Sequence, residues 1–300
     1  MTLTTDKARP NSTAFEPELA AAHSSAGIGS AATQLTWLVA ALALAASLAG
    51  LLIDGIYTGA AATAEMFRGY DLVTAVVVVP SLAVASRLAR RGSIRAQLVT
   101  TSLLAYLVYT YGYYLFGTGF NDLFLVHTAV FAIGVIALVL TVTDIDVVHV
   151  ADHFDPRTGV RITAGILGAL AVGLGGMWVY FAVDNAITGD VPGGSQLVET
   201  DTIVRLGMAL DLALLVPLYV VAAVLLWRRA AWGYVLAAVA LFAGLLHQLS
   251  YVVAMPFQVA ADIPGAVSYD PGEPVIVLLY VVATALLLRA VKPSTVRRVA

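Results

Sequence analysis

The stretch that decides the fold is LTWLVAALALAASLAGLLI, residues 35–53, which contains no charged residue. A helix that crosses the roughly 30 Å hydrocarbon core of a bilayer needs about 20 predominantly apolar residues, so this stretch is long enough to span. It begins far from the N-terminus and is longer than the apolar part of a signal peptide. We therefore interpret it as a membrane helix and not as a cleaved leader.

Seven further apolar runs of comparable length follow the first one. The chain is 60% hydrophobic and only 12% charged, with a mean hydropathy of +0.89, which lies outside the range of soluble globular proteins. The predicted fold class is therefore an all-α polytopic membrane protein with eight transmembrane helices. The further spans are expected at residues 71–88, 97–116, 123–143, 161–183, 204–226, 232–255 and 274–291.

Lysine and arginine are distributed unevenly between the loops that separate these runs. If the N-terminus is cytoplasmic, 14 of the 16 basic residues lie on the cytoplasmic side, and only Arg68 and Arg205 lie outside. Because cytoplasmic loops are enriched in Lys and Arg, both termini are predicted to be cytoplasmic, in the plasma membrane. Trp178 and Tyr180 fit an interfacial aromatic belt. The outer loops are acidic: Asp54, Glu65, Asp122, Asp184, Asp190, Glu199, Asp201, Asp262, Asp270 and Glu273.

Two parts of the chain repeat the same order of residues. In the second predicted span, Asp71-Leu72 is followed by Pro80 and then by an Arg pair at 90–91. In the sixth, Asp211-Leu212 is followed by Pro217 and then by an Arg pair at 228–229. Each half holds an even number of spans, so the halves share one orientation. We interpret the chain as two parallel four-helix repeats, with Pro80 and Pro217 as kinks or hinges.

The domain boundaries follow from these halves. The first residues are rich in Ala, Ser and Thr and show no apolar stripe, which is typical of a disordered tail. The predicted organisation is a disordered cytoplasmic tail at 1–33, a first membrane half at 34–143, a cytoplasmic linker at 144–160, a second membrane half at 161–291 and a basic cytoplasmic tail at 292–300.

Two aspartates fall within predicted spans. An ionisable side chain there costs roughly 3 kcal/mol to insert, so each is a functional candidate. Asp211 lies in the outer half of its span, and its alternative role is a packing carboxylate bonded to a neighbouring Tyr or His. Asp71 lies near the start of its span, where the alternative is a solvated acid or one stabilised by the helix dipole.

Two histidines are expected near the outer ends of their spans. His127 lies in the fourth span, and His247, followed by Gln248, lies in the seventh. Together with Asp211 they are candidates to hold a metal, ligate a haem or relay protons. The alternative is that each is a neutral hydrogen-bonding group between helices.

The third predicted span carries five tyrosines. Tyr106, Tyr109 and Tyr113 share one helix face by their spacing, whereas an interfacial belt explains Tyr111 and Tyr114. Stacked tyrosines beside carboxylates suit an organic cation, a quinone or a lipid headgroup, and helix packing is the alternative. Asn121 is expected to close the same outer mouth.

Several functional classes are excluded or unsupported. The chain has no cysteine, so disulfides, iron–sulfur clusters and cysteine nucleophiles are excluded. Neither lysine lies within a span, and no Walker or Gly-rich phosphate loop is present. His149 and His153 have the i, i+4 spacing of a metal pair, but a solvated loop is the expected setting. We predict no metal site and expect no cofactor.

The leading functional hypothesis is a small transporter-like or ligand-binding permease with an outward-facing acidic and aromatic pocket. The predicted ligand-binding residues are Asp71, Asp211, His127, His247, Gln248, Tyr106, Tyr109, Tyr113 and Asn121. The alternatives are a membrane-embedded enzyme or electron carrier that uses His and Asp at the outer leaflet, or a structural subunit. The expected partners are the lipid bilayer and a small-molecule or cation ligand, not nucleic acid, and a homo-oligomer is allowed.

Overall fold

The computed structural model describes residues 29–155, 159–190 and 195–292, and its regular structure in this part of the chain is helical. The elements are α2 (Ser30–Leu52), α3 (Ala61–Val73), η1 (Thr74–Val78), α4 (Val79–Ala89), α5 (Ile94–Gly117), α6 (Phe124–Thr143), α7 (Val147–Asp152), α8 (Val160–Thr188), α9 (Asp201–Leu210), η2 (Asp211–Leu215), α10 (Val216–Trp227), α11 (Ala231–Ala260) and α12 (Glu273–Ala290).

Within the described residues, seven helices are long and apolar enough to cross a membrane. The all-helical, multi-pass architecture predicted from composition is therefore found. Two of the seven are composite, because α3, η1 and α4 form one continuous helix and α9, η2 and α10 form another. The seven are Ser30–Leu52, Ala61–Ala89, Phe124–Thr143, Val160–Thr188, Asp201–Trp227, Ala231–Ala260 and Glu273–Ala290.

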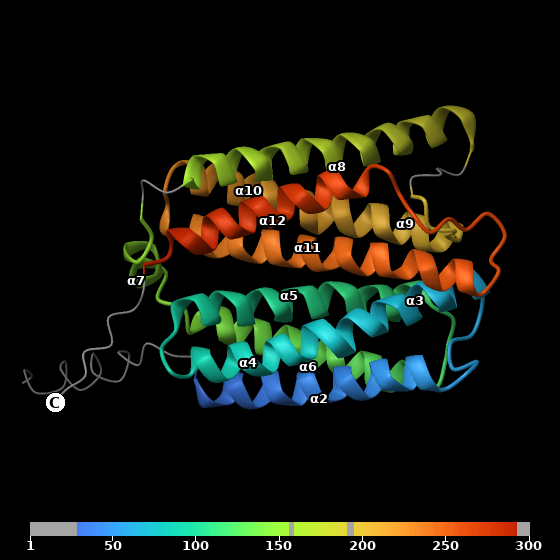
Figure 1. Cartoon of the computed structure of the whole chain (residues 1–300), viewed down its shortest axis with the longest axis horizontal. Helices are drawn as coiled ribbons and strands as arrows, with labels where there is room; N and C mark the ends of the chain where they lie inside the picture. Colours follow the sequence, from blue (N-terminus) through green and yellow to red (C-terminus); the bar gives the residue numbers. More distant parts are fainter. Residues whose placement is uncertain (1–28, 156–158, 191–194, 293–300) are drawn as a thin grey trace, which may run out of the picture.

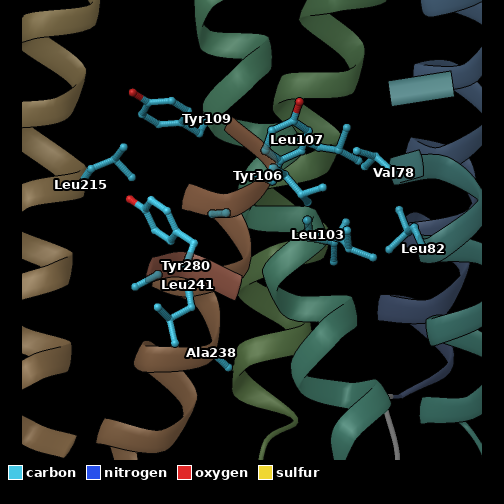
Figure 2. Packing of buried hydrophobic residues seen from close by; sticks show 14 of the residues in the cluster. Val78, Leu82, Leu103, Tyr106, Leu107, Tyr109, Leu215, Ala238, Leu241 and Tyr280 are labelled. Carbon is cyan, nitrogen blue, oxygen red and sulfur yellow. The ribbon is translucent and has the colours of Figure 1, made fainter. Parts of the chain in front are cut away.

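The remaining long helix is α5, which was predicted as the third span. It has 24 residues, of which 17 are buried, but its Thr, Ser and Tyr side chains make it less apolar than the seven. Figure 2 shows Leu103, Tyr106 and Leu107 of α5 with Val78 and Leu82 on one side and Ala238 and Leu241 of α11 on the other. A helix enclosed by other helices can carry polar residues, because they face protein and not lipid.

The long helices run roughly parallel to one axis and form two groups (Figure 1). One group contains α2, α3, α4, α5 and α6, and the other contains α8, α9, α10, α11 and α12. The groups meet where α11 packs against α3 and α5. At the α3–α11 crossing a Cβ on Gly69 would lie 2.5 Å from the Cα of Ala254, so only glycine allows this close approach.

Both composite helices contain a π-helical segment just before a proline. Segment η1 begins at Thr74, six residues before Pro80, and η2 begins at Asp211, six residues before Pro217. Proline has no backbone N–H and cannot continue the regular hydrogen-bond ladder, which the wider π turn accommodates. In this register, Thr74 and not Asp71 matches Asp211, so the two carboxylates do not hold matching positions.

Some predicted boundaries differ from the observed ones. Helix α3 begins at Ala61, ten residues before the predicted span, so Asp71 does not lie at a helix N-terminus. The helix α2 begins at Ser30, inside the predicted tail, and most of that tail, residues 1–28, lies outside the described part, as do 293–300. The predicted linker holds the short helix α7, which places the rings of His149 and His153 4.4 Å apart on the surface.

Candidate functional site

A cavity of about 510 Å³ lies in the second group of helices. Its walls come from α8, the composite helix α9–η2–α10, α11 and α12, with Tyr70 of α3 and Tyr113 of α5 contributed by the first group. Four carboxyl side chains line it, and no Lys or Arg is among its lining residues. Its carboxyl residues are Glu199, Asp211, Asp270 and Glu273; its aromatic residues are Tyr70, Tyr113, Trp178, Tyr219, Tyr251 and Tyr280.

Asp211 is the deepest acid in the wall, and it is only 5% exposed. The indole N–H of Trp178 on α8 donates to its Oδ2 at 2.7 Å, and the Tyr109 hydroxyl of α5 donates to its Oδ1. Both bonds are short contacts to a buried carboxylate, which such donors stabilise. No salt bridge to Asp211 is found among the described residues. Asp211 is therefore held by neutral donors and not by a Lys or Arg side chain.

His247 of α11 stands beside Asp211 and is surrounded by tyrosine rings. Its ring centroid lies 5.3 Å from that of Tyr109, 5.9 Å from that of Tyr113 and 6.2 Å from that of Tyr70. Its Nδ1 is buried and has no hydrogen-bond partner. A polar atom left unpaired beside a cavity is a ready hydrogen-bonding group for whatever enters that cavity.

The polar end of the cavity is formed by loop residues and the first turn of α12. The Gln248 amide donates to both carboxylate oxygens of Glu273, at 3.1 and 3.0 Å, and the Tyr251 hydroxyl donates to Asp270 at 2.9 Å. Glu199 lies just before α9, where burial, reinforced by the charge of Asp211, raises its pKa to about 7 although a hydrogen bond from Ser195 opposes the shift. This end is rich in acceptor oxygens that are held in place by neutral donors.

Asp71 lies outside the cavity, in a separate cluster within the first group of helices. It is 1% exposed and accepts hydrogen bonds from the Tyr57 hydroxyl at 2.6 Å and the Tyr114 hydroxyl at 2.8 Å. Burial and the negative charge of Asp71 raise the pKa of Tyr57, which therefore stays protonated as a donor. The solvated setting considered for Asp71 is wrong. A Cβ on Gly50 would lie 1.9 Å from the Oδ2 of Asp71, so a larger residue at position 50 would displace this carboxylate from its hydrogen bonds.

His127 belongs to the same cluster as Asp71. It is 1% exposed, its ring centroid is 4.7 Å from that of Tyr114 and 5.6 Å from that of Tyr111, and neither ring nitrogen has a partner. His127 and His247 thus contact different tyrosines. The structure does not bring the two histidines together with Asp211. No group of three or more His, Cys, Asp or Glu residues suited to a metal occurs in the described ranges.

The tyrosines of α5 divide between these two clusters. Tyr109 and Tyr113 face Asp211 and His247, whereas Tyr111 and Tyr114 face the cluster of Asp71 and His127. Tyr111 and Tyr114 are buried at 1% and 2%, so their assignment to an interfacial belt is wrong. Helix α5 therefore carries both clusters, one on each side.

Three other predicted site residues, Tyr106, Tyr109 and Asn121, are not among the lining residues of the cavity. The Tyr106 hydroxyl bonds to Ser250 of α11 at 2.6 Å and joins the two groups of helices. The Asn121 amide donates to Thr118 and to the carbonyl of Gly119, and its Oδ1 accepts from the Leu123 N–H, so it shapes the turn before α6. Of the predicted ligand-binding residues, those that line the cavity are Asp211, His247, Gln248 and Tyr113.

Sequence reasoning missed several residues of the cavity wall. The sequence predicts that Trp178 belongs to the interfacial belt, but it is 8% exposed and bonds to Asp211. The sequence indicates only loop acids at Glu199, Asp270 and Glu273, but Glu273, which directly precedes the predicted span at 274–291, begins α12 and is buried. An acid directly before an apolar run is the signal that could have identified Glu273.

Comparison with known proteins gives no relative from which a function could be transferred. No family model matches the chain, and neither the curated proteins nor the solved structures contain a significant match.

Proposed function

We propose that this chain is a membrane permease or ligand-binding protein for a small organic cation, and that the cavity is its binding site. The observation that supports this best is the charge of the wall, which carries four carboxyl groups and no Lys or Arg. Hydrogen bonds from Trp, Tyr and Gln hold these carboxylates in place without a protein cation. A cationic ligand would then balance the negative charge of the wall.

The aromatic residues support a cation over a neutral polar ligand. Six aromatic side chains share the wall with the acids, and the face of an aromatic ring attracts a cation within about 6 Å. The hydroxyl of Tyr219 bonds to that of Tyr280 at 2.7 Å, which satisfies both groups and leaves their rings as the contact surface. Such a wall suits ammonium groups that lack strong hydrogen-bond donors.

The proposal includes eight spans, with α5 as the additional one. Helix α5 connects the end of the bundle that holds α4's C-terminus to the end that holds α6's N-terminus (Figure 1). Two parallel repeats are supported by the matched π segments and prolines, and by the packing of α5 on α6 and α4, which parallels that of α11 on α12 and α10. We propose that the chain arose from such a duplication.

Both termini are proposed to be cytoplasmic, in a plasma membrane. Arg87 lies 4.5 Å from the Trp37 ring centroid and Arg161 lies 5.7 Å from that of Trp227, and these pairs share one end of the bundle. At the opposite end, Arg68 pairs with Asp54 and Glu65, and Arg205 pairs with Asp201. The acidic end also contains the polar end of the cavity, which would then face outward.

The test is binding of tetramethylammonium to the protein in nanodiscs, measured by isothermal titration calorimetry. We expect saturable binding that falls at least tenfold in Asp211→Asn and in Glu273→Gln, because each removes a carboxylate charge from the wall. Asp262→Asn is the matched control, since Asp262 is exposed and outside the cavity, and Asn tolerates its φ of 53°.

Two results would contradict the proposal. One is no binding of tetramethylammonium by a folded wild-type protein, and the other is an equal loss in Asp262→Asn. Glu273→Gln removes the charge but keeps an oxygen that accepts from Gln248, so it tests the loss of charge without removing this hydrogen bond. A melting curve for each variant shows whether the variant is folded. Counterflow of labelled tetramethylammonium in proteoliposomes then distinguishes a permease from a receptor-like protein.

A further inference from the structure

The cavity is strongly asymmetric along its length. Ser195, Glu199 and Asp270 come from the loops at one end, and Glu273 and Gln248 lie close to them. The opposite end is lined by apolar side chains of α8 and α12 and by the rings of Tyr219 and Tyr280, whose hydroxyls bond to each other, and no carboxylate occurs there. These apolar residues are Ala169, Leu170, Leu174 and Leu279.

The cavity is also long. Ile203 and Tyr219 both line it, and they are separated by 16 residues of one composite helix, which corresponds to roughly 24 Å at 1.5 Å per residue. On α8 the lining runs from Ala169 to Trp178, about 13 Å by the same rise. Because Trp178 marks the level of Asp211, the apolar part extends well beyond the last carboxylate.

The apolar part opens sideways out of the bundle. Ala169 and Gly173 of α8 line the cavity and are exposed, and Leu279 of α12 is half-buried. A Cβ on Gly173 would have no atom within 4 Å, so space remains beside the helix. The next outward-facing residue, Val172, is 76% exposed and apolar, as expected of a surface that meets lipid.

We infer that the ligand is a single-chain amphiphile with an ammonium head, whose head lies among the carboxylates and whose alkyl chain lies along α8 and α12. This inference rests on the proposed function and adds the chain to it. Four carboxylates select a cationic head, and the length and apolar lining of the cavity select an unbranched tail. The side opening at Gly173 gives the tail a route from the membrane.

The test is a chain-length series of alkyltrimethylammonium ions, from methyl to octyl, measured in nanodiscs against the same nanodiscs without protein. Burial of a methylene contributes about 0.8 kcal/mol, so affinity should rise about three- to fourfold for each methylene that enters the apolar part. Octyl sulfate, which has the same chain and the opposite charge, should not bind.

Gly173→Leu should remove the dependence of affinity on chain length, because a leucine at this position fills the space that the tail would occupy. Gly176→Leu is the matched control, since Gly176 is also exposed on α8, has open space at its Cβ and does not line the cavity. It should retain the full chain-length dependence.

The outcomes separate this inference from the proposed function. Equal affinity for tetramethylammonium and octyltrimethylammonium, or equal effects of the two leucine variants, would overturn the alkyl-chain assignment and leave the cation site standing. Absence of binding by every ammonium ion would overturn both. Binding of octyl sulfate as tight as that of octyltrimethylammonium would show that the carboxylates do not select the head of an amphiphile, and would overturn the amphiphile assignment alone.

Discussion

At the scale of single residues, the protonation of Glu199 should change both the folding stability and the affinity for a cationic ligand. Its pKa is raised to about 7 from an ordinary 4.5, mainly by burial and also by the charge of Asp211. Between these two values the unfolded chain binds fewer protons than the folded one, so folding stability falls as pH rises from 4.5 and levels off above about 7. Ionised Glu199 is the form that favours a cationic ligand.

We therefore expect opposite pH trends in the empty and the ligand-bound protein. The melting temperature of the empty protein should fall across this window, and tetramethylammonium affinity should rise across it. Glu199→Gln should reduce both dependences, with Asp262→Asn as control. Differential scanning calorimetry and titration calorimetry measure the two quantities. An unchanged pH profile in Glu199→Gln would show that other groups are responsible.

The residues of the site also show what sequence alone could predict. Asp211 and His247 stood out because polar groups are rare in apolar spans, and both line the cavity. Trp178 did not, because an indole near the end of a span is usually interfacial. Its bond to Asp211 depends on how α8 packs against η2, and no local pattern encodes that packing.

At the scale of elements, the π segments explain how the prolines act on the site. Segment η2 begins at Asp211 itself and ends two residues before Pro217. Because a π turn inserts one extra residue into the helix, residues on its two sides are rotated by about 100° relative to a continuous α-helix. The orientation of Asp211 toward Trp178 and the cavity therefore depends on Pro217. The prolines were visible in the sequence, but the π turns were not.

Replacing Pro217 with alanine should restore the missing N–H and allow a regular α-helix. We expect tetramethylammonium affinity to fall at least tenfold, because Asp211 turns out of its position, while thermal stability does not fall. Pro80→Ala is the matched control, since η1 has the same spacing but contributes nothing to the cavity wall. Affinity that is unchanged in Pro217→Ala, or lost equally in Pro80→Ala, would show that Pro217 does not determine the orientation of the Asp211 carboxylate.

At the scale of the whole molecule, hydropathy predicted the positions of the helices well. For α5 it predicted only a helix of sufficient length and not its central place in the bundle. The observed helices begin and end within about five residues of most predicted spans, and α3 is the clear exception. The first ten residues of α3 include Arg68 and Glu65, so a search for apolar runs leaves them out of the predicted span. They nevertheless belong to a helix that packs on α11. Helix α5 is the reverse case, a central helix whose polar residues serve the two clusters and lower its hydropathy.

The absence of native cysteine allows the crossing of α5 to be tested directly. Arg91 precedes α5, Asp122 follows it, and both are exposed. If α5 crosses the membrane, a cysteine at 122 should react with a membrane-impermeant maleimide on intact cells, and a cysteine at 91 should react only after permeabilisation. Asp262→Cys, in the loop after α11, should behave like Asp122→Cys.

Labelling of 91 and 122 from the same side would mean that α5 returns without crossing. The cavity, whose wall includes Tyr113 of α5, would then lie beside a re-entrant helix, and the parallel repeats would be excluded, because halves with different numbers of crossings cannot share one orientation.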